Sequence, residues 1–325
     1  MDTLKAINNI EEQIQRLVTE KNRLIDSVCR DGYVRQPGRD DPDVTGGFTP
    51  VDRLHIDGNT VVVYQGVPGA YSHQAMHDYF GNDIKSINVP KFEDVIETVR
   101  SGKADYGVLP IENSSAGFVN GIYDMVSGSG LTVVGGDEVK VTHTLMGLPD
   151  AELTDIRSVY SHPQGLMQCS EFLDAAGYTQ VPVANTAVGA VKVRDDRDKT
   201  QAAIASRLAA DIYGLKVLRD DIVNNENNTT RFIILSKKKE YVKNSSNVSI
   251  CFSLPHESGT LYSILGHIKH AGLNMTSIES RPLRGRKWEY SFYITLEGNL
   301  HDSATVDALE RIRNDSLDFK IIGTY

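Results

Sequence analysis

The sequence has few cysteines and lacks a long apolar run. Its 325 residues include three scattered cysteines, Cys29, Cys169 and Cys251, so neither a disulfide framework nor a zinc site is predicted. No run approaches the roughly 18 apolar residues of a membrane span. Residues 1–5 lack the basic start and apolar core of a signal peptide. We therefore predict a cytoplasmic protein with free thiols and no membrane partner.

Basic residues are fewer than acidic ones. The chain has 34 Lys and Arg against 43 Asp and Glu, a formal net charge of −9, which argues against nucleic acid as a partner. No His, Cys and Asp cluster has metal-ligand spacing. Gly66-Val67-Pro68-Gly69 lacks the third glycine of a dinucleotide fingerprint. We therefore predict no metal and no cofactor.

The composition, 40% hydrophobic and 24% charged, is that of a globular protein, and the length predicts two or three domains. Apolar residues recur at helical spacing up to about residue 30. The Gly-, Pro- and Asp-rich residues 31–58 then indicate a linker or a poorly ordered segment. Residues 1–58 are thus predicted to form a short helix and a linker.

Two folded domains are predicted beyond this segment. In residues 59–237, strand-like runs such as 61–64, 106–111, 131–134 and 202–205 alternate with helical runs, which predicts an α/β domain with a largely parallel sheet. A lysine run and an Asn- and Ser-rich stretch mark the next boundary. Residues 247–325 have the order strand, helix, strand, strand, helix, strand, which is the ferredoxin-like βαββαβ order.

Five short motifs are the most specific feature of the chain. Thr229-Thr230-Arg231-Phe232 stands where an Asn-rich loop becomes a core strand, and a guanidinium there needs an anion to pair with. The other motifs are Gln65 to Ser72, Pro110 to Ser114, Ser161 to Gln164 and Glu279 to Pro282. In this order and at these spacings, the set resembles prephenate dehydratase with a C-terminal ACT domain, over residues 60 to 325.

The turns that carry these motifs could bind an anion. Three of them precede predicted helices, as does a further turn at Asn185-Thr186, and free N–H groups and dipoles at helix N-termini attract anions. In an open α/β sheet such turns lie at the carboxyl ends of the strands, where ligands bind. His73 and His162 could donate protons there, but we favour a role in satisfying backbone groups at a helix start. Glu112 could act as an acid or orient Asn113.

The resemblance implies a catalytic domain of two lobes, like a type II periplasmic binding protein. It makes Thr230 the catalytic residue, a hydrogen-bond donor or relay to the departing hydroxyl of prephenate. Arg231 would hold a substrate carboxylate or only brace the loop. The remaining substrate-binding positions that it implies are Ser72, Asn113, Ser114, Gln164, Asn185 and Thr186.

The resemblance also implies that the C-terminal domain binds phenylalanine as an effector, at a seam between subunits of a homodimer or homotetramer. Glu279 and Arg281 could equally pair across that seam. The effector residues that it implies are Gly259, Leu261, Asn274, Glu279, Ser280, Arg281 and Pro282.

The expected function is therefore the decarboxylating dehydration of prephenate to phenylpyruvate in phenylalanine biosynthesis, regulated by phenylalanine. The helix before residue 31 resembles the first helix of a chorismate mutase domain, but a mutase needs about three helices, so we interpret it as a remnant. Two alternatives stay open: a bifunctional chorismate mutase/prephenate dehydratase, and a non-catalytic amino-acid sensor of the same fold.

Overall fold

The computed structural model describes residues 13, 16–17, 20, 43–225, 227–283 and 289–325. The described residues from 44 to 325 form one compact unit. The predicted N-terminal helix lies almost wholly outside the described residues. The four residues described there, Gln13, Arg16, Leu17 and Glu20, are helical and exposed.

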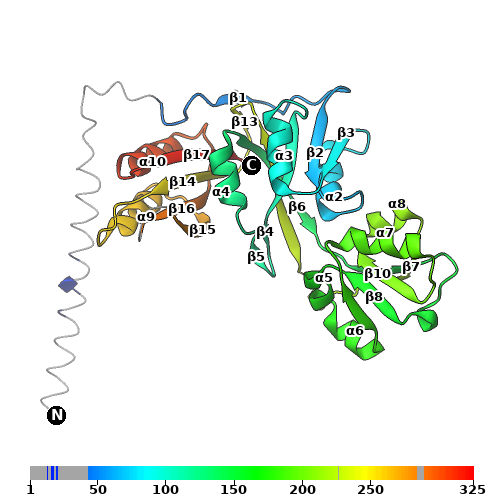
Figure 1. The fold of residues 1–325 in the computed structure, drawn as a ribbon. Coiled ribbons are helices and arrows are strands. Elements are labelled where there is room, and N and C mark those ends of the chain that lie inside the picture. Colours follow the sequence, from blue (N-terminus) through cyan, green and yellow to red (C-terminus); the bar gives the residue numbers. More distant parts are fainter. Residues whose placement is uncertain (1–12, 14–15, 18–19, 21–42, 226, 284–288) are drawn as a thin grey trace, which may run out of the picture. The chain divides into compact units, whose positions relative to one another are not determined.

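The larger of two main sheets has the strand order β15-β16-β14-β17-β6-β12-β4-β2-β3, with β5 paired to β4 (Figure 1). The predicted strands 61–64, 106–111 and 131–134 correspond to β2, β4 and β6, and β12 holds the predicted apolar run 232–235. The members before the C-terminal part are β2 (Val61–Gln65), β3 (Lys85–Val89), β4 (Tyr106–Asn113), β5 (Gly117–Phe118), β6 (Thr132–Lys140) and β12 (Thr229–Ser236).

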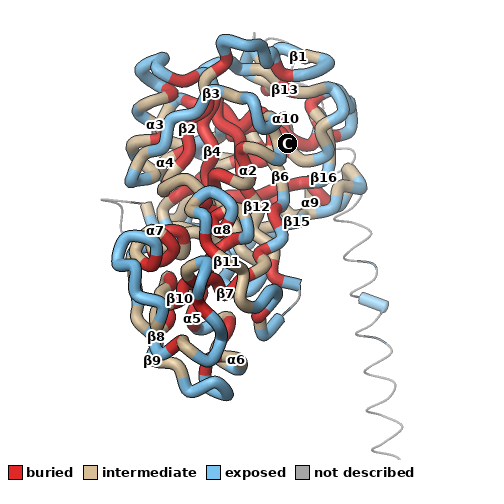
Figure 2. The backbone as a smooth tube through the Cα atoms, turned by 90° about the vertical axis from the view of Figure 1, so that its right-hand side faces the viewer, coloured by how far each residue is buried: buried red, intermediate tan, exposed pale blue. Residues whose placement is uncertain are grey.

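Helices cover both faces of the central strands β2, β4 and β12, because these strands are apolar on both faces. On β2, Val63 packs into one core cluster, while Val62 and Tyr64 pack into another, as the alternation of side chains along a strand requires. β2 and β4 are among the buried segments at the centre of the upper part of Figure 2. The helices are α2 (Tyr71–Phe80), α3 (Phe92–Arg100) and α4 (Ile122–Ser129).

The chain leaves this sheet after β6, builds a second sheet, and returns as β12. The second sheet has the order β11-β7-β10-β8-β9 and forms a separate lobe, green in Figure 1. Both sheets are mixed, whereas a largely parallel sheet was predicted. The lobe consists of β7 (Thr144–Gly147), the 3-10 helix η1 (Leu153–Asp155), β8 (Ser158–Ser161), α5 (Pro163–Gln168), α6 (Ser170–Ala176), β9 (Thr179–Pro182), α7 (Thr186–Asp196), β10 (Gln201–Ala205), α8 (Arg207–Tyr213) and β11 (Lys216–Arg219).

The C-terminal part follows the predicted element order and joins the first sheet. It consists of β14 (Asn247–Ser253), α9 (Thr260–His270), β15 (Met275–Pro282), β16 (Tyr290–Glu297), α10 (Ser303–Asn314) and β17 (Phe319–Thr324). β17 pairs with β6 in parallel at Gly323 and Val133. Tyr293 and Ile322 enter the core that lies under α3 and α4, so the two parts share one sheet and one core.

The described part of the predicted linker is ordered, contrary to one interpretation of its composition. β1 (Thr49–Val51) pairs in parallel with β13 (Glu240–Val242). Val44 and Phe48 pack into the C-terminal core, and Leu54 packs into the core around β2. These three apolar side chains were not recognised as core residues within the Gly- and Pro-rich sequence. Their packing connects residues 44–54 to both parts.

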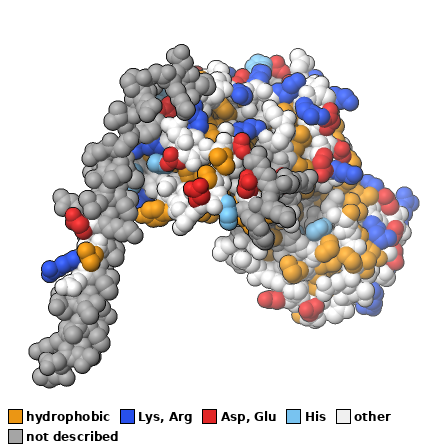
Figure 3. Space-filling model, turned by 60° about the vertical axis from the view of Figure 1, so that its left-hand side comes forward, with side chains coloured by type: hydrophobic (Ala, Val, Ile, Leu, Met, Phe, Trp, Pro, Cys, Tyr) orange, Lys and Arg blue, Asp and Glu red, His pale blue; other side chains and the backbone are white. Residues whose placement is uncertain are grey.

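On the face shown in Figure 3, acidic and basic side chains are interspersed. Within the described residues, no helix is both long enough and apolar enough to cross a bilayer.

Candidate active site

A cavity of about 370 Å³ lies where the turns of the two lobes meet, within the usual range for small-molecule sites. Six of the predicted site residues line it: Ser72, Asn113, Gln164, Asn185, Thr186 and Thr230. Among the described residues that line it, none is Asp, Glu, Lys or Arg. The wall therefore combines apolar side chains with polar ones and carries no permanent charge.

Thr230 and Asn113 form the best-defined polar pair of the wall. They are register partners on β12 and β4, and Asn113 Nδ2 donates to Thr230 Oγ1 at 2.9 Å. Asn113 Oδ1 accepts from the backbone N–H groups of Ser115 and Ala116 at 3.1 and 3.0 Å, which determines the orientation of the amide. Because the Thr230 oxygen accepts from Asn113, its own proton remains available to a bound molecule.

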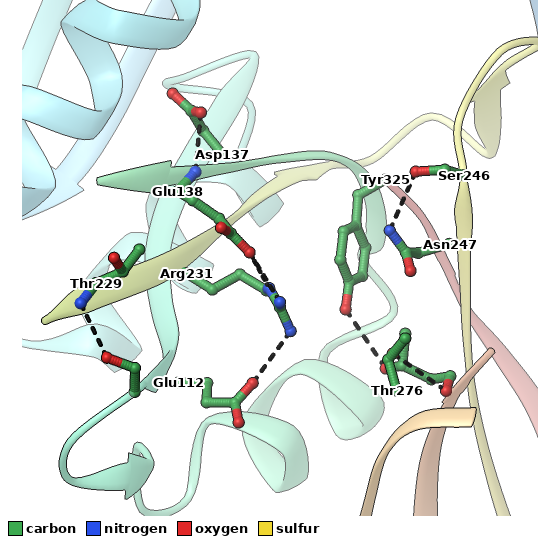
Figure 4. A network of polar contacts seen from close by, with 11 residues as sticks. Glu112, Asp137, Glu138, Thr229, Arg231, Ser246, Asn247, Thr276 and Tyr325 are labelled. Carbon is green, nitrogen blue, oxygen red and sulfur yellow. Dashed lines mark hydrogen bonds and ion pairs between the residues drawn. The ribbon is translucent and has the colours of Figure 1, made fainter. Parts of the chain in front are cut away.

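Arg231 does not line the cavity, because neighbouring side chains on a strand point to opposite faces. Its guanidinium pairs with Glu112 at 3.1 Å and with Glu138 at 2.8 Å (Figure 4). Of the two roles left open for Arg231, these contacts favour bracing the strand over holding a substrate carboxylate.

Ser114 also lies outside the cavity lining. Its Oγ donates to the carbonyl of Asn227 and accepts from the N–H of Thr229, at 3.0 and 2.9 Å. The segment around it is not the helix start that was expected. It is a turn closed by Asn113 between β4 and β5, and α4 begins only at Ile122 after Gly121. Ser114 therefore connects the turn after Asn113 to the segment that leads into Thr230.

The second lobe contributes helix starts to the opposite wall. Asn185 caps α7, its Oδ1 accepting from Val188 N–H at 2.8 Å. Pro163 is the first residue of α5, as predicted, and His162 Nδ1 caps that helix by accepting from Gln164 N–H at 3.2 Å. On the first lobe, Ser72 lies in the first turn of α2 and is 6% exposed.

Sequence reasoning missed a group formed by the buried His143 with Tyr71 and Gln168, all in the cavity lining. His143 Nδ1 lies 3.0 Å from the Tyr71 hydroxyl, and its Nε2 lies 2.9 Å from Gln168 Oε1. Burial lowers the pKa of His143, so the imidazole is neutral. His143 has no partner nearby in sequence, but Gln168 could have been found, because it lies one helical turn after Gln164.

His73 and His162 satisfy backbone groups, as we favoured. His73 Nδ1 accepts from Gly69 N–H at 3.1 Å, and its Nε2 lies 2.9 Å from His77 Nε2. Burial, reinforced by His77, lowers the pKa of His73 to about 4, and burial also lowers the pKa of His162. Gly69 itself has φ +83°, and a Cβ there would lie 2.8 Å from the Ala209 Cα. His73 thus supports the turn that touches the second lobe.

We expect stability to decrease as the pH falls from about 6.5 to about 4. In this window the unfolded His73 binds a proton that the folded His73, with a pKa of about 4, does not. The stabilisation is complete above pH 6.5 and amounts to about 1–3 kcal/mol. Denaturant unfolding at about pH 7.5 and pH 5 measures it. His73→Asn, whose oxygen can replace Nδ1, should lose less stability on acidification; an equal loss in both proteins would contradict this assignment.

The predicted effector residues lie in or beside α9 and β15. Gly259, at φ +92°, precedes α9, and a Cβ there would meet no atom within 4 Å. Leu261 packs against the C-terminal core, and Asn274 O accepts from Glu297 N–H at 2.8 Å. On β15, which also holds Ser280 and Pro282, Arg281 Nε lies 3.3 Å from Glu279 Oε1 of the same chain.

Within the described residues, no three His, Cys, Asp or Glu side chains gather in a way that could hold a metal ion. The polar side chains that line the cavity are amides, hydroxyls and imidazoles.

Comparisons with known proteins identify the family. The family model for prephenate dehydratase matches residues 62–240. The bifunctional chorismate mutase/prephenate dehydratase of Neisseria gonorrhoeae is 31% identical over 98% of this chain and 95% of its own length. A solved prephenate dehydratase from Arthrobacter aurescens, in complex with L-Phe, is 29% identical, with a TM-score of 0.76 over 82% of this chain and 90% of that one.

A second solved structure, described as GqqA, a novel type of quorum quenching acylase, is 32% identical, with a TM-score of 0.76 over 82% of this chain and 97% of that one. The family model covers more than half of the chain, and the Neisseria relative exceeds 30% identity over nearly its whole length. The chain therefore belongs to the prephenate dehydratase family.

Proposed function

We propose that the cavity between the lobes converts prephenate to phenylpyruvate, with Thr230 as the hydrogen-bond donor to the departing hydroxyl. The observation that carries this role is the Thr230–Asn113 pair, whose geometry leaves the Thr230 proton free. A threonine hydroxyl is too weak an acid to ionise near neutral pH, so it assists by donating a hydrogen bond. The ring carboxylate leaves as carbon dioxide, and its bonding electrons enter the ring as the hydroxyl leaves.

A wall without permanent charge suits this chemistry. α2 and α7, of 10 and 11 residues, both begin at the cavity, and their N-terminal dipoles favour a bound carboxylate. A fixed cation next to the ring carboxylate would stabilise the substrate at least as much as the transition state, and such binding does not raise kcat. We assign Ser72, Gln164, Asn185 and Thr186 to substrate binding at these helix starts.

The direct test mixes purified protein with prephenate and follows phenylpyruvate, with and without phenylalanine. Turnover would exclude the non-catalytic sensor. Because a structural neighbour is described as an acylase, the fold alone does not specify the reaction. A protein that leaves prephenate unchanged would contradict the proposed function.

We further propose that residues 247–325 form an ACT domain that binds phenylalanine between subunits of a homo-oligomer, and that residues 59–237 form a catalytic domain of the type II binding-protein kind. The sheet order β15-β16-β14-β17 supports a ferredoxin-like unit. The L-Phe complex of the Arthrobacter structure supports phenylalanine as the effector. The cytoplasmic location stays a prediction.

Gly259→Val should abolish phenylalanine inhibition and spare turnover without effector. The open space at Gly259 is where the effector backbone would approach, and a side chain would occupy it. The φ of +92° also makes the variant less stable, by about 1–2 kcal/mol. Calorimetry on the full chain measures binding, with Gly266→Ala, at an open helical position, as the control. Unaltered inhibition of Gly259→Val would place the effector elsewhere.

Removing residues 1–43 should leave dehydratase turnover unchanged, and the full chain should not convert chorismate to prephenate. A longer deletion to residue 50 also removes Val44 and Phe48 from the C-terminal core, so it should lower the unfolding free energy by about 3 kcal/mol or more. Activity assays and denaturant unfolding of both truncations test this. Chorismate mutase activity in the full chain would support the bifunctional alternative.

A further inference from the structure

The face of β12 opposite the cavity carries a charged cluster that the proposed reaction does not use. Arg231 Nε and Nη2 donate to Glu138 Oε1 at 3.1 and 2.8 Å, and Arg231 Nη1 donates to Glu112 Oε2 at 3.1 Å. The side chains of Arg231 and Glu112 are each 30% exposed, so water screens this ion pair only in part. The cluster joins three adjacent strands, β4, β12 and β6.

The cluster lies directly behind the catalytic pair. Arg231 follows Thr230 on β12, and Glu112 precedes Asn113 on β4. Thr230 is the register partner of Asn113, and Arg231 is the register partner of Glu112. The register shifts immediately afterwards, between Arg231 and Phe232, and such an irregularity weakens the strand ladder locally. The ion pair therefore supports the register in which Asn113 Nδ2 lies 2.9 Å from Thr230 Oγ1.

Tyr325 brings the C-terminal part close to the same cluster. A Cβ at Gly136 of β6 would lie 3.0 Å from Tyr325 Cδ2, which places the ring against β6 two residues before Glu138. Figure 4 shows the Tyr325 ring on the side to which the Arg231 guanidinium extends. Burial opposes the charge of Arg231, but Glu138, Tyr325 and Glu112 outweigh it and raise the pKa of Arg231. The Tyr325 hydroxyl also lies 3.4 Å from Thr295 Oγ1 of β16.

We propose that Arg231 is a positioning residue for Thr230, and that Tyr325 couples the C-terminal part to it. This inference rests on the proposed function, because it assumes that Thr230 assists the departing hydroxyl. A displacement of β17 against β6 would move Tyr325, change the ion pairs of Arg231, and turn the Thr230 hydroxyl away from its working orientation. The C-terminal part thereby controls turnover from the back of the catalytic strand.

Steady-state kinetics of Arg231→Met tests the positioning role, with Arg100→Met as a matched control. Arg100 forms an exposed ion pair with Glu97 on α3. We expect kcat of Arg231→Met to fall about ten- to a hundredfold, the range for a small misplacement, with KM within about twofold. Arg231→Lys should recover part of kcat. A raised KM with unchanged kcat would show instead that Arg231 holds substrate, and would overturn the inference.

A double-mutant cycle tests the coupling to Tyr325. Tyr325→Phe alone should lower kcat severalfold but should have no further effect on Arg231→Met, because residues that act through one network are not additive. Additive effects would overturn the coupling. An active wild type whose Arg231→Met variant keeps full kcat overturns this inference alone. A wild type that does not consume prephenate overturns the proposed function, and this inference with it.

Discussion

Thr230→Val should lower kcat for prephenate by about a hundredfold or more, with KM nearly unchanged. The loss of one positioned hydrogen-bond donor has an effect of this size. Valine has nearly the shape of threonine, so the wall of the cavity is preserved. Asn113 Nδ2 is not left unpaired either, because it also donates to Asn228 Oδ1 at 2.8 Å. The loss would therefore report the missing hydroxyl rather than a collapsed site.

Two variants serve as controls for this result. Thr230→Ser restores a hydroxyl and should recover much of kcat. Thr229→Val removes a hydroxyl from the adjacent residue, which does not line the cavity, and should leave kcat close to normal. Near-normal turnover of a folded Thr230→Val protein would remove Thr230 from the centre of the mechanism.

Gly323→Ala should separate β17 from β6 and lower the unfolding free energy by about 3 kcal/mol or more. A Cβ at Gly323 would lie 1.9 Å from Val133 O and 2.7 Å from Val133 N, at a φ of +152°. These are backbone atoms, so no side-chain rotation can relieve the overlap. Because Gly323 and Val133 pair where the C-terminal part joins the large sheet, the variant should unfold in two thermal transitions instead of one.

Thermal unfolding followed by circular dichroism measures this effect. Gly266→Ala is the matched control, because Gly266 lies within α9 and a Cβ there would meet no atom within 4 Å. Alanine in a helix is favoured over glycine by about 1 kcal/mol, so this variant should be slightly more stable. A single transition at the wild-type temperature for Gly323→Ala would mean that the sheet junction tolerates a side chain.

The sequence by itself determined the element order of the C-terminal part and six of the residues that line the cavity. Apolar runs of strand length predicted β2, β4 and β12, because local hydrophobic pattern and burial agree there. The helix starts at Pro163 and Asn185 were equally readable, since a cap depends on residues within one turn. The motifs that carry the family resemblance contain Thr230 and Asn113, so both could be named as site residues, though the hydrogen bond between them could not be predicted.

Only the tertiary structure decided which side chains face the cavity. Thr230 and Arg231 are adjacent in the motif, yet the pleat of β12 directs Arg231 to Glu112 and Glu138 on the other face. In the cavity wall, His143 contacts Tyr71, which lies 72 residues away in the sequence, and Gln168, which lies 25 residues away. Pairings of this kind depend on strand register and lobe packing, and interactions between residues far apart in the sequence leave no local pattern from which they could be predicted.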